Sequence, residues 1–272
     1  MHPRSVLRAV SVRAQPAGGF AIARPLAALG LNLDPFLMVD WFSGDTDPFG
    51  PHPHAGFSAV SWLLPSSVGR IRNRDTLGDD TYFGGGELHW FEAAQGAIHN
   101  ETPDGVVDGL QIFVNLPLAH KHAPPRTYRA HHTDIPTVDV GLSFVRVVVG
   151  SAFGVTSPVV PRTPDIGLID IELKGELQLP IPRSHNAFVV VTDGQGRVTV
   201  NGISDANAVA LGHDGDAVVL EGRGHVVVFH GEPLNEPVFA AGPFVMGNRA
   251  DLQDAILRYQ RGDMGVLAPV DD

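Results

Sequence analysis

Apolar and polar residues alternate along most of this chain, and the alternation predicts many short β-strands. Because successive side chains of a strand point to opposite faces, a period of two marks a segment with one buried face. In VVVTDGQGRVTV (189–200), Asp193-Gly194 and Gly196 are typical of a tight hairpin turn. The clearest strand patterns cover residues 57–64, 88–94, 109–116, 143–149, 167–173, 187–200, 216–220 and 225–230. We therefore expect an all-β chain, folded as a sandwich or a barrel.

Two segments depart from this pattern. Residues 248–262 place Leu252 and Ile256 on one helix face, between Asn248 as N-cap and Gly262 as C-cap, and so predict a short C-terminal helix. Residues 117–140 are polar, rich in proline and without a period. We interpret this second segment as a connector between two strand-rich halves of similar size.

Composition narrows the chemistry. The chain of 272 residues has no cysteine, which excludes disulfides, thiolate metal sites and cysteine nucleophiles. Its net charge of −11 argues against direct nucleic-acid binding. No apolar run approaches the roughly 20 residues of a membrane helix, and the N-terminus lacks the apolar stretch of a secretory signal. We therefore expect a cytoplasmic protein, and any metal must be bound by His, Asp or Glu.

The stretch FGPHPHAGF (49–57) places His52 and His54 two residues apart between prolines. On an extended backbone, which the prolines favour, both imidazoles point to one face with Cα atoms about 6.5 Å apart. They could therefore bind one ion together. A surface loop stiffened by prolines has the same spacing, so this stretch alone does not decide.

A second stretch, AAQGAIHNETP (93–103), places His99 and Glu101 two residues apart as well. If the two stretches face each other inside a barrel, they bring together three imidazoles and one carboxylate. That donor set suits Fe(II), Mn(II), Ni(II), Cu(II) or Zn(II). A further His-x-His pair, His120 and His122, lies in the connector, where we expect a solvated loop.

Several blocks of the sequence, in this order, strongly resemble the pirin family. They are DPFLMVDWF (34–42), PHPHAGF (51–57), WFEAAQGAIHNE (90–101), GLQIFVNLP (109–117) and GEPLNEPVFAAGPFVM (231–246), followed by the helix. Pirins belong to the cupin superfamily. The resemblance implies two tandem cupin-type β-barrels, a metal-binding barrel in residues 1–130 and a metal-free barrel in residues 131–272 that carries the helix.

The resemblance also implies the site. It gives the roles of ligands to one metal ion, in the family usually iron, to His52, His54, His99 and Glu101. It implies a quercetin 2,3-dioxygenase-type reaction, in which a flavonol and dioxygen react at the metal. For such a reaction we expect Glu101 to accept the flavonol hydroxyl proton as general base. The alternative it implies is an iron-dependent, redox-sensing regulator that acts through a protein partner without turnover.

Some positions depart from the pattern of the superfamily. Ser58 stands where many cupins have a glutamate, and Ala94 stands where the second motif usually has a proline. In the second half, His185 has no His-x-His partner. His225 and His230 are expected to be strand residues. Near the first site, the aromatic residues expected to form an apolar wall are Phe57, Trp62 and Trp90.

Overall fold

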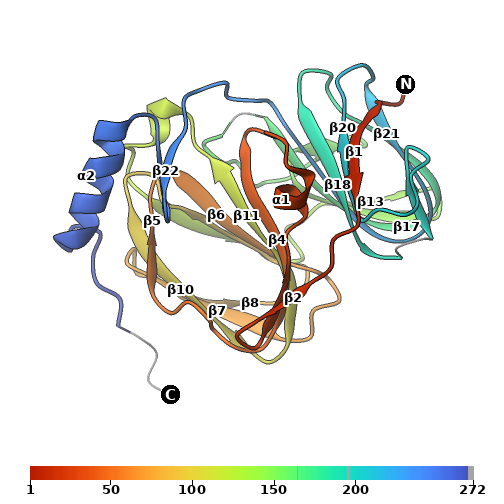
Figure 1. Cartoon of the computed structure of the whole chain (residues 1–272). Helices are drawn as coiled ribbons and strands as arrows, with labels where there is room; N and C mark the ends of the chain where they lie inside the picture. The colour runs from red at the N-terminus through yellow and green to blue at the C-terminus, as the bar shows by residue number, and fades with distance from the viewer. Residues whose placement is uncertain (164, 195–196, 269–272) are drawn as a thin grey trace. The chain divides into compact units, whose positions relative to one another are not determined.

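The computed structural model describes residues 1–163, 165–194 and 197–268, and they form two compact units (Figure 1). Unit 1 comprises residues 1–13, 24–35 and 133–234, and unit 2 comprises residues 14–23, 36–132 and the described part of 235–272. The all-β prediction with a C-terminal helix is confirmed. Within the described ranges, no helix is long and apolar enough to cross a membrane.

The division between the units is not a single cut in the sequence. The chain passes from unit 2 to unit 1 between His132 and Thr133, close to the boundary expected at 130–131. The terminal segments differ from that expectation, because residues 1–13 belong to unit 1 and residues from 235 onward belong to unit 2. Long-range strand pairing, which local patterns do not encode, assigns these segments to their units.

Unit 2 has a seven-stranded sheet in the order β12-β9-β6-β11-β4-β3-β2 and a four-stranded sheet in the order β5-β10-β7-β8. Phe91 of the first sheet stacks on His99 of the second, so the two sheets face each other. The elements of unit 2 are β2 (Gln15–Ala17), β3 (Phe20–Ala23), β4 (Phe36–Gly44), β5 (His52–His54), β6 (Phe57–Leu63), β7 (Arg70–Asp75), β8 (Asp80–Phe83), β9 (Leu88–Glu92), β10 (Ala97–Asp104), β11 (Val107–Asn115), the 3₁₀ turn η1 (Leu118–His120), β12 (Arg126–Ala130), β22 (Phe239–Ala241), β23 (Phe244–Met246) and α2 (Arg249–Gln260).

The C-terminal segment completes unit 2. Asn248 caps α2 by accepting a hydrogen bond from the backbone amide of Asp251, as the sequence predicts. Leu252 and Ile256 of α2 pack with Ala55, which follows β5, and with Ile98, which lies on β10 next to His99. Figure 1 shows α2 beside β22 and β5. The helix therefore buries its apolar face against the part of the barrel that carries the candidate ligands.

Unit 1 is built on one large sheet in the order β1-β20-β18-β21-β17-β14-β13, with β19 paired to β21. Its described core is aliphatic and includes Val189, Val209 and Val228. The elements of unit 1 are β1 (Val6–Val10), α1 (Pro25–Leu29), β13 (Thr137–Val140), β14 (Ser143–Val149), β15 (Ser151–Ala152), β16 (Val155–Thr156), β17 (Ile166–Pro180), β18 (Asn186–Asp193), β19 (Val198–Val200), β20 (Ala208–Leu211) and β21 (Ala217–Gly231).

The hairpin prediction for residues 187–200 is wrong in its pairing. The long strand β21 pairs with β18 along one part of its length and with β19 along another. Gly194 has the positive φ, +88°, that the predicted turn needs. Gly196 lies outside the described residues. Both β18 and β19 run antiparallel to β21, so they point in the same direction and are not the two arms of a hairpin.

Candidate metal centre

Two short strands of the four-stranded sheet position the candidate ligands. β5 and β10 pair antiparallel, with His99 directly opposite His52 and Ala97 opposite His54. Because residues two apart share a face, His54 joins His52 and His99 on one side of this pair. The two stretches do not face each other across the barrel: they lie side by side in one sheet, and this pairing brings the imidazoles to one face.

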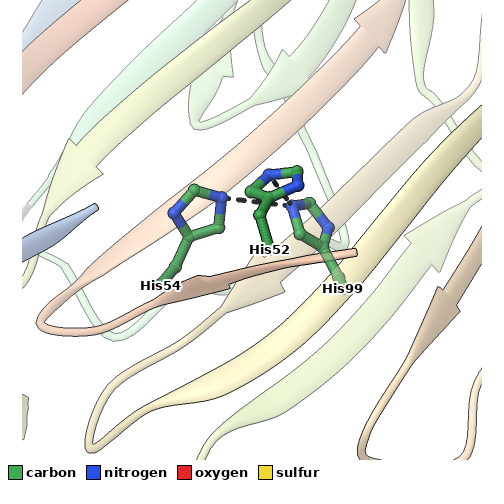
Figure 2. A group of neighbouring side chains, drawn as sticks. All are labelled: His52, His54 and His99. Carbon is green, nitrogen blue, oxygen red and sulfur yellow. Dashed lines mark hydrogen bonds between the residues drawn. The ribbon is translucent and has the colours of Figure 1, made fainter. Parts of the chain in front are cut away.

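The three imidazoles converge through their Nε2 atoms (Figure 2). Nε2 of His99 lies 3.1 Å from Nε2 of His54 and 3.2 Å from Nε2 of His52. Metal–nitrogen bonds of about 2.0–2.1 Å at ordinary coordination angles separate two ligand nitrogens by roughly 2.9–3.4 Å. The residues therefore fit a single metal ion bound by three histidines.

The protonation states of the rings also fit a metal. The Nδ1–H of His52 donates to the carbonyl oxygen of Gly50 at 2.8 Å, which leaves the Nε2 lone pair facing the other two rings. Burial, and then the neighbouring His52, lowers the pKa of His54 well below its ordinary value. Burial, and then His54 and His52, does the same to the pKa of His99. Neutral imidazole is the form that binds metals.

Glu101 follows His99 on β10, and its carboxylate is held by hydrogen bonds. The hydroxyl of Ser61 on β6 donates to its two oxygens at 2.8 and 2.9 Å. Nδ1 of His89 lies 3.6 Å from the same carboxylate. The tight group of ligand atoms, all within 4.8 Å of one another, is formed by the three imidazoles. Glu101 thus lies two residues after His99, and its carboxylate is hydrogen-bonded to Ser61 of the opposite sheet.

Aromatic rings surround the imidazoles on the side of the seven-stranded sheet. Phe91 stacks on His99 with ring centroids 4.5 Å apart, and Phe57 and Phe113 contact His54 edge-on at 5.0 and 5.3 Å. Of the three residues expected to form an apolar wall, only Phe57 is in it. Trp62 on β6 and Trp90 on β9 point to the face of the sheet opposite to Phe57 and Phe91. On that face, Trp90 stacks on Tyr128.

Sequence reasoning missed the polar residues behind Glu101. Ser61 is buried, and its Oγ also lies 3.0 Å from Oε1 of Gln111, while the fully buried His89 accepts or donates a hydrogen bond at Thr127. The available signal was the alternation of inward and outward side chains along each strand. Ser61 and His89 each occupy an inward position of a strand whose other inward positions are apolar.

The remaining histidine expectations can be compared with the structure. His122 is exposed and contacts Asp251, as expected for a connector residue. His225 and His230 both lie on β21. Lys121, between the two connector histidines, is buried instead of solvated. Its ammonium donates to the carbonyl oxygens of Gly56 and Val245 and to the side chain of Asn115.

Two β units with a triple-histidine centre in one of them define a protein of the two-domain cupin class. The sequence model of Pirin matches residues 21–114, and that of the Pirin C-terminal cupin domain matches residues 168–265. The chain belongs to the pirin family.

Known relatives resemble the chain along most of its length. A pirin-like protein of Solanum lycopersicum is 34% identical over 97% of this chain and 94% of its own length. Human pirin is 33% identical over 86% of this chain and 84% of its own length. The crystal structure of a quercetin 2,3-dioxygenase from Acinetobacter baumannii superposes with a TM-score of 0.85 at 28% identity, covering 97% of this chain and 99% of that one.

Proposed function

We propose that this protein is a metal-dependent dioxygenase that opens the heterocycle of a flavonol, in a reaction of the quercetin 2,3-dioxygenase type. The observation that carries the proposal is the convergence of three imidazoles beside an anchored carboxylate. The similarity to a quercetin 2,3-dioxygenase over nearly the whole chain supports the choice of substrate class. Under this proposal, His52, His54, His99 and Glu101 are the metal ligands.

The donor set favours a first-row divalent ion, and we propose Fe(II). When bound, such an ion supplies Lewis acidity and a redox centre for a flavonol and dioxygen. The overall reaction inserts both oxygen atoms of dioxygen and releases the ring carbon that bears the 3-hydroxyl as carbon monoxide. The chain itself must orient the flavonol, accept its hydroxyl proton and keep water away.

Glu101 is the proposed proton acceptor for the flavonol 3-hydroxyl. A general base must lie within hydrogen-bond reach of the proton that it takes, and the two Ser61 hydrogen bonds hold this carboxylate in one place. Phe57, Phe91 and Phe113 line the site with apolar rings. These rings exclude water and match a planar aromatic substrate.

The test is quercetin turnover by protein loaded anaerobically with Fe(II) and then mixed with air-saturated buffer. We expect the flavonol absorbance to decay with the wild type and not with Glu101→Gln or His54→Ala. His122→Ala, an exposed histidine away from the cluster, is the matched control and should behave as the wild type. If the fully loaded wild type leaves quercetin intact, the dioxygenase proposal fails and the metal-dependent regulator, acting through a protein partner, takes its place.

A further inference from the structure

One carboxylate joins the loop before β5 to the middle of β10. Oδ1 of Asp47 accepts hydrogen bonds from the backbone amides of Phe49 at 3.0 Å and Gly50 at 2.9 Å. Its other oxygen, Oδ2, accepts from Nδ2 of Asn100 at 2.5 Å. The hydroxyl of Thr102 lies at 3.4 Å from the same oxygen. Asp47 therefore binds both segments that carry the imidazoles.

The first of these contacts leads directly to His52. Gly50, whose amide Asp47 holds, is the residue whose carbonyl oxygen accepts the Nδ1–H of His52. In metal sites, such an outer hydrogen bond selects the tautomer of the ligand and fixes the plane of its ring. By fixing the peptide around Gly50, Asp47 determines where that carbonyl points.

The second contact leads to β10. Asn100 is buried and lies between His99 and Glu101 on the strand, so its side chain points to the other face of β10. The hydrogen bond from Asn100 to Asp47 ties that strand to the loop that precedes His52. The separation between the two histidine-bearing segments is thus held from behind the imidazoles as well as by the pairing of β5 with β10.

We propose that Asp47 is a positioning residue of the metal centre, which acts through Gly50 on the ring of His52 and through Asn100 on β10. The inference rests on the proposed metal site and not on the proposed substrate. Loss of an outer partner of this kind typically weakens metal affinity by roughly 10–100-fold. A residue that only closed the turn at 47–50 would affect folding and leave the metal centre unchanged once the protein is folded.

The experiment measures Co(II) binding, because Co(II) reports its own coordination through its visible spectrum. Asp47→Ala removes both sets of contacts. Asp47→Asn keeps an oxygen that can accept from the amides of Phe49 and Gly50 but loses the second acceptor for Asn100. Asp45→Asn is the matched control, because it removes the same charge from an exposed position two residues away. Affinity is determined by competition with a chromophoric chelator, and folding by the thermal transition of each metal-free variant.

We expect Asp47→Ala to weaken Co(II) affinity by about 10–100-fold and to shift the visible bands. Asp47→Asn should show a smaller loss in the same direction, and Asp45→Asn should stay within about twofold of the wild type. Wild-type affinity and spectrum in folded Asp47→Ala would overturn the proposal. If Asp47→Ala does not fold, unchanged Co(II) binding by Asp47→Asn would overturn it equally.

These outcomes are separable from those of the proposed function. A wild type that binds Co(II) but does not consume quercetin refutes the dioxygenase and leaves the role of Asp47 to be decided by the same titration. A folded wild type that binds no Co(II) refutes the metal centre, and the inference about Asp47 falls with it.

Discussion

The two units have the same order of core strands, but a histidine at an equivalent position has different surroundings in each unit. In unit 2, β9-β6-β11-β4 lie side by side, and in unit 1 β20-β18-β21-β17 repeat this order in the same relation to the chain. A P-x-x-H-x-x-F pattern leads into the second strand along the chain in both, at residues 51–57 and 182–188. His54 and His185 are therefore equivalent by sequence pattern and by topology.

The surroundings of the two histidines differ. His54 meets two further imidazoles because β5 and β10 form a separate sheet opposite β6. His185 meets a single imidazole, that of His230, with Nδ1 atoms 3.0 Å apart. Beside this pair lies a guanidinium, since Arg4 donates to the carbonyl oxygens of His185 and Pro182. Unit 1 thus brings together two imidazoles, a guanidinium and the Asp165 carboxylate, 3.9 Å from Nε2 of His185, whereas unit 2 brings together three imidazoles.

The largest expected contrast is in metal affinity. His54→Ala removes one of three converging imidazoles, so its affinity for Co(II) should fall by more than the roughly 100-fold at the upper end of outer-partner losses. His185→Ala makes the equivalent change in unit 1 and should leave both the affinity and the amount of bound metal unchanged. Chelator competition measures both variants, and a comparable loss in the two would contradict the contrast between the units.

A second contrast concerns stability. Lys121→Met leaves three buried acceptors in unit 2 without their donor, and we expect it to lower the free energy of unfolding by about 2–4 kcal/mol. Lys174→Met, an exposed lysine of unit 1, should change it by less than about 0.5 kcal/mol. Urea denaturation followed by far-ultraviolet circular dichroism, which reports on both units, measures both variants. Equal effects would show that the buried ammonium does not stabilise unit 2 through these hydrogen bonds.

A third contrast is in the pH dependence of unit 1. Burial, and then His185 and Arg4, lowers the pKa of His230 to about 3. Between about pH 6.5 and 3, the unfolded chain binds a proton here that the folded chain does not. Stability from His230 is therefore present above pH 6.5 and is lost as the pH falls toward 3, by up to a few kcal/mol.

Replacing the titrating ring tests this sign. His230→Gln should flatten the acid side of the stability profile, measured by urea denaturation from pH 7 to pH 4. His213→Gln, at an exposed histidine of the same unit, should leave the slope as in the wild type. An unchanged slope in His230→Gln would contradict the assignment.

The smallest expected effect comes from the polar interior of unit 2. Ser61→Ala removes the two hydrogen bonds to Glu101 and should lower kcat/KM for quercetin about tenfold, which corresponds to roughly 1.4 kcal/mol. Ser58→Ala is the control, because Ser58 is also buried on β6 but its side chain points to the opposite face of the sheet. If both serines have the same effect, anchoring of Glu101 is not what Ser61 contributes.

Local sequence patterns predicted the histidines of the candidate metal centre, but not the residues that form hydrogen bonds around it. The His-x-His and His-x-Glu spacings locate the ligand candidates because strand parity is a local property. Ser61, His89 and Asp47 escaped notice because their roles depend on which strands face each other. Neighbouring residues of β9 point to opposite faces of the sheet, so Phe91 lines the site and Trp90 does not. The sequence alone does not show which face is inward.

The same limit applies to the fold. Strand existence and the capped C-terminal helix follow from local periodicity and from Asn248. The interval 117–140 was interpreted as a connector, yet it contains β12, β13 and the buried Lys121. Its polar and proline-rich composition hid these short strands. β12 depends on β9, a partner distant in the sequence, whereas β13 pairs with β14, which follows it directly.

The most direct test of the account is the stoichiometry of the reaction in protein loaded with Fe(II). Oxygen consumption, flavonol loss and carbon monoxide release are followed together in the wild type and in His54→Ala. The account predicts one molecule of oxygen consumed and one of carbon monoxide released for each quercetin lost, and none of the three changes in His54→Ala. Flavonol loss without carbon monoxide, or equal loss in the variant, would contradict it.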